Sequence, residues 1–501
     1  MIGHPMACRL GGGLLAALSL VPWLGPAGCA INPVSGRPEV VLVSAAQEQR
    51  LGDEEAKKVE ADVGVYDDAA LGAYLTDLGR RLAEQSPRKD VSYTFRILNM
   101  VEPNAFALPG GHVYVSRGLL ALVNSEDELA GTVGHEVGHV AARHSVEAIT
   151  RTAPFAIITG LTAGVTGLVI PSLGRVIGGI GNTATSLVVS PFNRQQEREA
   201  DEVGQEIAAK AGWDPAGLST FLGTLERDDV LRRHGPRKTS FFDTHPATPE
   251  RVKDTAARAK QLSRAAGQPI SDSTASFLAR LDGLVVGPRA ADGLIEDRSY
   301  LHPDLDIRMD VPERWTIENA AQHVAAANRD GTQALLLNVA GSGEDPLDGA
   351  RALEESTKTP LVKHVQRFTV NGLAAAGIAI QTETKQGPLA LDLVWMAHAG
   401  RIYQLAGASP AARSEAFRPV FDEILRSFRP LTKAERAGIR EQRLRLVHAR
   451  HDEPLDALAA RTHSAWTAEQ IAVANGLAPN TRLAEGTLVK IVVAEPYRSN
   501  P

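Results

Sequence analysis

The sequence predicts a multidomain chain in which three folded parts follow an N-terminal leader. Residues 44–265 repeat apolar side chains with helical spacing, which predicts a mainly α domain over residues 29–270. Residues 295–431 alternate in short runs, which predicts an α+β domain with helices on one side of an antiparallel sheet. Residues 444–494 have the pattern of a small βααβ module. With 501 residues, the chain can bury a core in each part.

Residues 1–28 are predicted to be a signal peptide. Arg9 is the only basic residue there, and residues 10–24 are uncharged, mostly apolar and too short for a confident membrane span. Ala-Gly-Cys at residues 27–29 resembles the end of a bacterial lipobox, which implies lipidation of Cys29. A plain secretory signal is the alternative.

The composition limits the classes of partner. The formal net charge is −6 at pH 7, and removal of the leader takes away one basic residue, so nucleic acid is not expected as a partner. The chain has two cysteines, and Cys29 alone remains after the leader is removed. The mature domains therefore depend on their cores without disulfides.

A helix is predicted to begin after Ser125, because residues 125–128 have the form of a capping box in which Glu128 reaches back to the amide of Ser125. An apolar stripe follows at Leu129, Val133, Val137 and Val140. Three glycines lower the helix propensity, and we expect another element to pack closely against them: Gly131, Gly134 and Gly138.

This helix carries the motif H-E-x-x-H. The spacing puts His135 and His139 on one face, about 6 Å apart along the axis. Two neutral imidazoles there can share one tetrahedral metal ion, so we expect one Zn²⁺ per chain. Glu136 is then placed to take a proton from a metal-activated water, which predicts hydrolysis of peptide bonds.

The sequence excludes one class of zinc site. Metzincins would have glycine at position 142 and histidine at position 145, where this chain has Ala142 and Ser145. His144 is nine steps from His135, close to the opposite face of a continuous helix. We therefore expect it to be solvated or to cap the helix and not to bind the metal.

A third zinc ligand is expected from Glu-Arg-Glu-Ala-Asp at residues 197–201, which opens another helical pattern ending at Gly212. Glu197 and Asp201 share a face, so one carboxylate can bind zinc while the other holds a zinc-bound imidazole by its second nitrogen. Spacing alone does not choose between Glu197 and Glu199 as the ligand.

The two motifs together resemble the zinc endopeptidase family that includes BepA, HtpX and the CAAX prenyl proteases. Its members carry H-E-x-x-H on one helix and E-x-x-A-D on a later one. The resemblance implies a gluzincin-like zincin fold with a small edge sheet, with Glu197 as the third ligand and Asp201 behind a zinc-bound imidazole. It also implies protein or peptide substrates.

Residues 104–120 also resemble this family, in which the segment forms a strand edge beside the metal. An extended substrate can add to such an edge through main-chain hydrogen bonds. The resemblance implies a set of substrate-binding residues: Gly110, Gly111, His112, Val113 and Tyr114.

Residues 244–251 resemble the family signature H-P-x-x-x-x-R, which implies that His245 and Arg251 are catalytic residues near the zinc. A cation there would stabilise the oxyanion of the tetrahedral intermediate. In BepA-like members the matching histidine can bind zinc at rest. We therefore hypothesise that His245 is a fourth, displaceable ligand; a turn histidine before Pro246 is the alternative.

Residues 154–173 are uncharged, rich in glycine and long enough to cross a bilayer by hydropathy. They lie between two zinc-binding helices that must converge. We therefore expect a lid or a membrane-contacting hairpin here in preference to a true span.

The α+β domain is expected to have strands at 307–311, 333–339, 375–382, 389–397 and 401–408, and helices at 350–356 and 414–427. Pro-x-x-Trp at 312–315 and Ser-Phe-Arg at 427–429 resemble the small domains of the PsbP and Mog-like type. Trp315, Trp395 and Tyr403 are expected in the core.

Residues 444–494 resemble a LysM module, which implies contact with peptidoglycan. The usual Gly-Asp-Thr turn is replaced by His-Asp-Glu at 451–453. Glycan binding and a small docking domain without a ligand both stay open.

Two classes of function follow. The first is a zinc endopeptidase of the bacterial cell envelope, held by a lipid anchor and facing the periplasm, with the outer membrane favoured, that degrades misfolded or stalled proteins. The second is a chaperone or assembly factor whose protease site is mostly latent. BepA-like proteins carry helical repeats for client docking, and the sequence shows no such repeat.

Overall fold

The computed structural model describes residues 28–148 without 35, 37 and 42, and then residues 191–233, 241–246, 249–267, 269–384 and 387–499. Residues 1–27 of the expected leader and the stretch 154–173 lie outside the described residues. In the described part of the chain, no helix is long and apolar enough to cross a membrane.

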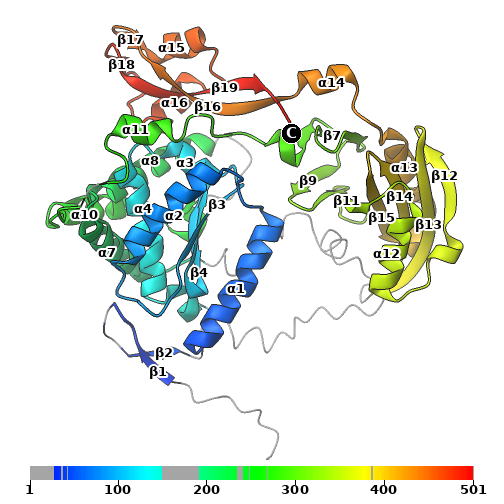
Figure 1. The fold of residues 1–501 in the computed structure, drawn as a ribbon, viewed down its shortest axis with the longest axis horizontal. Helices are drawn as coiled ribbons and strands as arrows, with labels where there is room; N and C mark the ends of the chain where they lie inside the picture. The colour runs from blue at the N-terminus through cyan, green and yellow to red at the C-terminus, as the bar shows by residue number, and fades with distance from the viewer. Residues whose placement is uncertain are drawn as a thin grey trace, which may run out of the picture.

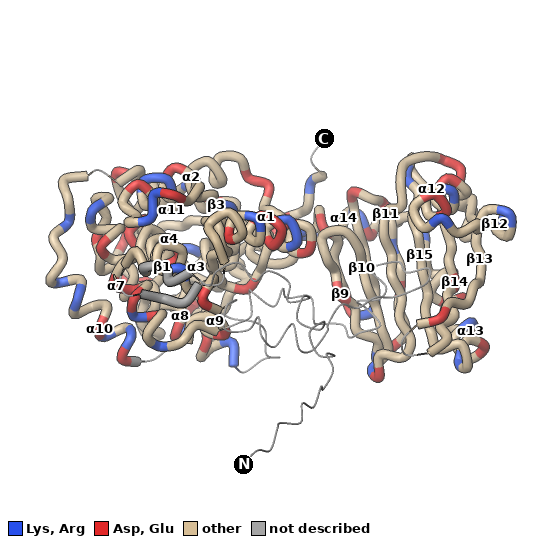
Figure 2. The backbone as a smooth tube through the Cα atoms, turned by 90° about the horizontal axis from the view of Figure 1, so that it is seen from below, with Lys and Arg blue, Asp and Glu red and all other residues tan. Residues whose placement is uncertain are grey.

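The chain folds into a helical lobe, a sheet lobe and a C-terminal module that lies on the helical lobe (Figure 1). Acidic and basic residues are interspersed over both lobes (Figure 2).

The helical lobe contains α1 (Ala45–Asp62), α2 (Ala69–Ala83), α3 (Arg117–Leu122), α4 (Glu126–Ala141), α7 (Arg194–Ala211), α8 (Ala216–Arg232), α9 (Phe241–Thr244), α10 (Pro249–Ala259) and α11 (Thr274–Ala279). It also holds the hairpin of β1 (Gly28–Ile31) and β2 (Pro38–Val41), and a sheet of β3 (Thr94–Leu98), β4 (Ala105–Leu108) and β5 (His112–Ser116) in the order β3-β5-β4.

The predicted helix at the H-E-x-x-H motif is confirmed as α4. The Ser125 side chain accepts a hydrogen bond from the amide of Glu128, and three acidic residues occupy the first turn. The capping box is incomplete, because Glu128 accepts from the amide of Asn124 in place of that of Ser125. The helix ends at Ala141, and Arg143 takes the left-handed conformation with φ 61°.

The glycines of α4 allow two helices to touch it, as expected. A Cβ at Gly134 would lie 2.9 Å from the carbonyl oxygen of Gly204 on α7, and one at Gly138 would lie 2.8 Å from that of Ala200. Gly131 faces α8 in the same way. At the α4–α7 contact, the backbones of the two helices that carry the motifs therefore touch each other directly.

The sheet lobe is one antiparallel sheet in the order β12-β13-β14-β15-β11-β10-β9. Its elements are β9 (Thr316–Ala320), β10 (His323–Ala327), β11 (Ala334–Ser342), α12 (Leu347–Thr357), β12 (Gln366–Val370), β13 (Leu373–Thr384), β14 (Gly387–His398), β15 (Arg401–Pro410) and α13 (Ser414–Ser427). A small sheet of β6 (Leu294–Glu296), β7 (Ser299–His302) and β8 (Ile307–Asp310) precedes it.

The expectation of helices on one side of this sheet is wrong. Trp395 and Ile402 pack in the cluster beneath α12, whereas Met396 and Tyr403 pack with α13 on the other face. Because β14 and β15 are apolar on both faces, each face needs a cover. Trp395 and Tyr403 are fully buried, as expected, and the partly buried Trp315 packs against the α13 cluster.

The C-terminal module has the expected order of strand, helix, helix and strand. It contains β16 (Arg440–His448), β17 (Glu453–Pro454), α15 (Leu455–Thr462), α16 (Ala468–Ala474), β18 (Arg482–Leu483) and β19 (Leu488–Pro496), with β16 and β19 antiparallel. α14 (Lys433–Gly438) connects it to the sheet lobe.

The core of the helical lobe extends beyond residue 270, where this domain was expected to end. Phe277 and Leu281 belong to it, and so does Leu444 of the module. The amide of Gly283 donates to the Leu444 carbonyl, and that of Leu444 donates to the Leu284 carbonyl, both at 2.8 Å. The sheet lobe is therefore inserted between two segments that pair with each other.

Lys490 ties the module to the beginning of α4. Its buried ammonium donates hydrogen bonds to the carbonyls of Ala121, at 3.0 Å, and Val123, at 2.7 Å, where α3 ends. Burial lowers the pKa of Lys490, while the nearby carboxylate of Glu128 acts in the opposite direction.

Gly204→Ala is expected to destabilise the helical lobe by about 1–3 kcal/mol, because its Cβ would lie 2.6 Å from the main-chain nitrogen of His135. Urea unfolding of the metal-free chain measures this loss. The matched control is Gly223→Ala in α8, where a Cβ meets nothing within 4 Å, so that stability should rise by about 0.4–1 kcal/mol. Equal effects of the two substitutions would contradict the close helix contact.

Candidate metal centre

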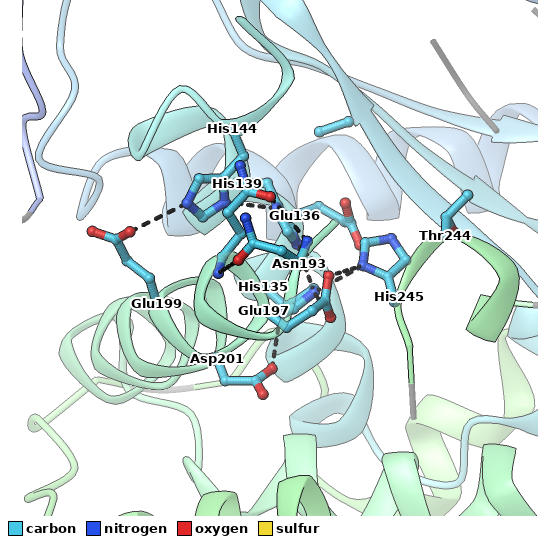
Figure 3. Close-up of polar contacts among 12 residues, drawn as sticks. His135, Glu136, His139, His144, Asn193, Glu197, Glu199, Asp201, Thr244 and His245 are labelled. Atoms are coloured by element: carbon cyan, nitrogen blue, oxygen red, sulfur yellow. Dashed lines mark hydrogen bonds and ion pairs between the residues drawn. The ribbon is translucent and has the colours of Figure 1, made fainter. Parts of the chain in front are cut away.

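Four buried side chains converge in the helical lobe (Figure 3). His135 and His139 come from α4, Glu197 comes from the first turn of α7, and His245 follows α9. One ligand atom from each lies within 4.8 Å of the others. The structure thus brings the three expected ligands and the hypothesised fourth one to a single point.

The imidazoles are oriented as a metal site requires. The Nε2 atoms of His135 and His139 face each other at 3.0 Å. The Nδ1 atom of His135 lies 2.8 Å from Oδ1 of Asp201, so Nδ1–H donates to the carboxylate and the lone pair of the ring is on Nε2. A set of two nitrogens and one carboxylate, with His245 beside them, fits zinc.

The structure resolves the choice between the two glutamates. Oε1 of Glu197 lies 3.4 Å from Nε2 of His139, and Oε2 lies 3.7 Å from Nε2 of His135. Glu199 points elsewhere: its Oε2 atom lies 3.3 Å from Nε2 of His144. Of the two, only Glu197 is in the cluster.

His144 is not solvated, so that alternative is wrong, but it lies outside the ligand group, as expected. It is buried, and its Nδ1 atom lies 2.9 Å from Nδ1 of His139. The helical projection assumed that α4 continues, but α4 ends at Ala141 and the left-handed Arg143 folds the chain back. The sequence pattern carries no signal for that turn, because arginine does not favour positive φ.

Glu136 is fully buried beside the cluster. Its Oε1 atom lies 3.6 Å from Nε2 of His245, and neither carboxylate oxygen has a hydrogen-bond partner among the described residues. Burial raises the pKa of Glu136. A carboxylate of raised pKa at this place suits a general base.

Arg251 lies at the site, as expected, where it pairs with the carboxylates of Asp201 and Glu197. Its Nε and Nη2 atoms donate to the two oxygens of Asp201 at 2.7 and 2.8 Å, and Nη1 lies 2.6 Å from Glu197 Oε2. Burial alone would raise the pKa of both carboxylates, but the charge of Arg251 helps to hold each pKa below its usual value. Direct contact of Arg251 with an oxyanion stays a prediction.

Aromatic rings close the site. The ring of Phe192 stacks on His139 with centroids 4.0 Å apart, and that of Phe241 stacks on His245 at 4.4 Å. A small cavity of about 210 Å³ lies beside Glu197 and Arg251. His135, Glu136, His139 and His245 are all fully buried.

The expected substrate-binding segment needs a correction. His112, Val113 and Tyr114 lie on β5, the middle strand, which pairs with β3 on one side and β4 on the other. Gly110 and Gly111, with φ of 76° and 92°, form the turn that leads into it. The main chain of β5 is therefore already paired.

The edge strand of this sheet that lies beside α4 is β4, Ala105–Leu108. Within the described residues, β4 pairs with β5 alone, and it packs against α4. The ring of His112 and the hydroxyl of Tyr114 instead reach α1, where they contact Asp53 and Glu60 at 2.9 and 2.8 Å. The sequence alone did not reveal which strand forms the edge, because strand order depends on pairing between segments that are far apart in the chain.

Residues 69–259 match the model of Peptidase family M48. The Beta-barrel assembly-enhancing protease of Escherichia coli is 29% identical over 235 residues, which are 46% of this chain and 47% of that protein. Metalloprotease LoiP of Escherichia coli is 28% identical over 217 residues, 42% of this chain and 80% of that protein. The chain spans about half the length of the Beta-barrel assembly-enhancing proteases that it matches.

These matches confirm the predicted resemblance, and they support a metalloendopeptidase with zinc at the buried group. Among solved structures, cyanobacterial PsbP of Synechocystis covers 29% of this chain and 99% of that chain, with a TM-score of 0.23 and 11% identity. A likeness of this size carries no argument, so the PsbP-like and Mog-like assignment of residues 295–431 stays a prediction.

Arg251→Gln is expected to cost about 3–5 kcal/mol of unfolding free energy at pH 7, because it leaves buried carboxylates without their cation. Glu197 and Asp201 have lower pKa values in the folded chain than in the unfolded chain, where carboxyl groups titrate near pH 4. Their ionisation therefore stabilises the fold above about pH 4, and this stabilisation is lost as the pH falls below that value. The variant should therefore approach the parent in stability below about pH 4.

Urea unfolding of the metal-free proteins at pH 7 and pH 3 measures this. Arg258→Gln on the same helix is the control, since Arg258 pairs with a partly exposed Glu206 and should change stability by less than about 1 kcal/mol. A deficit in Arg251→Gln that is independent of pH would contradict the assigned pairing.

Proposed function

We propose that this chain, whose residues 69–259 form a Peptidase family M48 domain, is a zinc-dependent endopeptidase of the bacterial cell envelope. Its substrates are misfolded or stalled envelope proteins. The observation that carries the proposal is the buried group of His135, His139 and Glu197 beside the carboxylate of Glu136, which accepts no hydrogen bond from any described residue. The relatives named Beta-barrel assembly-enhancing protease and LoiP support the compartment.

The residues divide the reaction among them. Zinc held by His135, His139 and Glu197 would lower the pKa of a water and polarise the scissile carbonyl. Glu136 takes a proton as the water oxygen attacks the carbonyl carbon, and it delivers that proton to the amine nitrogen as the C–N bond breaks. Arg251, paired with Glu197 and Asp201, keeps both carboxylates ionised.

The substrate adds to β4 as an extended strand. Main-chain hydrogen bonds at Ala105–Leu108 would hold many sequences alike, which suits a protease that acts on unfolded segments. Pairing at this edge would place the scissile bond along α4, where Glu136 lies.

Two segments of the chain support a location in the cell envelope. Lipid at Cys29 anchors the protein to a membrane, with the outer membrane favoured, and the LysM-like module at 444–494 contacts peptidoglycan. The net charge of −6 disfavours nucleic acid as a partner.

Glu136→Gln is expected to lower casein cleavage by about 10²-fold or more, because general base catalysis is lost while the ligands remain. Cleavage is measured with the zinc-loaded protein, and zinc content is measured beside it. Glu226→Gln, at an exposed position on α8, should leave cleavage unchanged. If Glu136→Gln cleaves casein at the parental rate, the protease proposal fails.

A second function is favoured by the closed site. His245 lies in the ligand cluster, with Nδ1 3.0 Å from Glu197 Oε1, and the reacting groups are buried. Such a site is latent until it opens, which suits a chaperone or assembly factor that cleaves rarely. An envelope phenotype that survives Glu136→Gln, after cleavage is lost, would favour this function.

His245→Ala is expected to raise casein cleavage several-fold, because it removes a side chain that closes the cluster. The exposed His364→Ala serves as the control and should cleave at the parental rate. The double variant Glu136→Gln/His245→Ala should be inactive. A fall in cleavage for His245→Ala would instead show that His245 takes part in the reaction, and the closure role would be abandoned.

A further inference from the structure

We propose that His144 and Glu199 are positioning residues that fix the proton of His139, so that its Nε2 atom is free to bind zinc. This inference rests on the proposed zinc site, and it concerns two side chains outside the ligand group. The three residues form a chain that runs from the centre of the site toward the surface (Figure 3).

The contacts are continuous. Nδ1 of His139 lies 2.9 Å from Nδ1 of His144, and Nε2 of His144 lies 3.3 Å from Oε2 of Glu199. The side chain of His144 is 2% exposed and that of Glu199 is 21% exposed, so the chain ends at a carboxylate within reach of water.

The positions of the protons give this chain of hydrogen bonds a direction. A neutral imidazole carries one N–H, and His139 can present a lone pair at Nε2 only if its proton is on Nδ1. That proton needs an acceptor, which is Nδ1 of His144, so the proton of His144 must be on Nε2. The carboxylate of Glu199 accepts that proton, and every group in the chain is then satisfied.

The opposite arrangement is disfavoured. A proton on Nε2 of His139 would point toward Nε2 of His135, only 3.0 Å away, and would block metal binding. A proton on Nδ1 of His144 would oppose that of His139 and would leave the Glu199 carboxylate without a donor from this ring. The partly exposed carboxylate therefore selects the tautomer of a ligand with which it has no direct contact.

Local backbone geometry builds this chain. The left-handed Arg143 returns His144 to the end of α4, and the close contact between Gly138 and Ala200 brings the first turn of α7 alongside. Glu197 and Glu199 are two residues apart, about 200° around the helix, so one faces the ligands and the other faces His144.

The test measures zinc affinity and not proteolysis. His144→Leu is expected to raise the zinc dissociation constant about 10–100-fold in competition with a chelator. His144→Asn should restore most of the affinity, because its Oδ1 atom can accept at the place of Nδ1. If His144→Asn and His144→Leu lose affinity equally, the histidine acts by packing and the proposal is overturned.

A second pair of variants avoids the buried position. Glu199→Ala is expected to weaken zinc binding several-fold, whereas the exposed Glu202→Ala on the same helix should leave it unchanged. Equal affinities for these two proteins would overturn the role of Glu199 even if His144→Leu failed to fold.

The proton itself gives a spectroscopic signature. In the Co²⁺-substituted protein, the Nδ1 proton of His139 should give a shifted NMR resonance that exchanges slowly with water, and His144→Leu should abolish it. The resonance of His135, held by Asp201, should persist and serves as the control. Loss of both resonances or of neither would overturn the proposal. A parent chain that binds no zinc would instead remove the proposed function, and this inference with it.

Discussion

The helical lobe depends on the contact between α4 and α7. Gly134 and Gly138 on one helix, and Gly204 on the other, let the two backbones meet without intervening side chains. Only at that distance can Glu197 and Asp201 reach the histidines of the H-E-x-x-H motif, because carboxylate side chains are short. The ligands, the Asp201 contact and the His144–Glu199 chain all follow from this one approach.

Burial sets the electrostatics of the same region. Glu136, Glu197 and Asp201 are buried together, and Arg251 is the guanidinium that pairs with two of them. Buried charges of one sign are costly unless they are compensated. A divalent cation between the two facing imidazoles would balance the remaining negative charge, so the pattern of charges favours a metal independently of the motif.

Local patterns predicted the site better than long-range ones. The spacing of His135 and His139 fixed their common face, and the glycines of α4 correctly indicated a close neighbour. The turn at Arg143 and the central position of β5 escaped prediction, because one depends on a backbone conformation that arginine seldom adopts and the other on strand order. Alternation predicted β8, β11, β13, β14 and β15, whereas β9, β10 and β12 were not predicted. The cover on both faces was also missed, because neighbouring apolar residues of one strand face two different cores.

The pairing of residues 283–286 with β16 has a consequence for how the chain can be divided. The segment that leads into the sheet lobe and the strand β16 that follows it lie side by side, so excision of this lobe would leave adjacent ends for a short linker. The C-terminal module is the reverse case. Truncation after α14 would remove Leu444 from the core of the helical lobe and leave the carbonyls of Ala121 and Val123 without Lys490. The C-terminal module is therefore expected to be needed for the stability of the helical lobe.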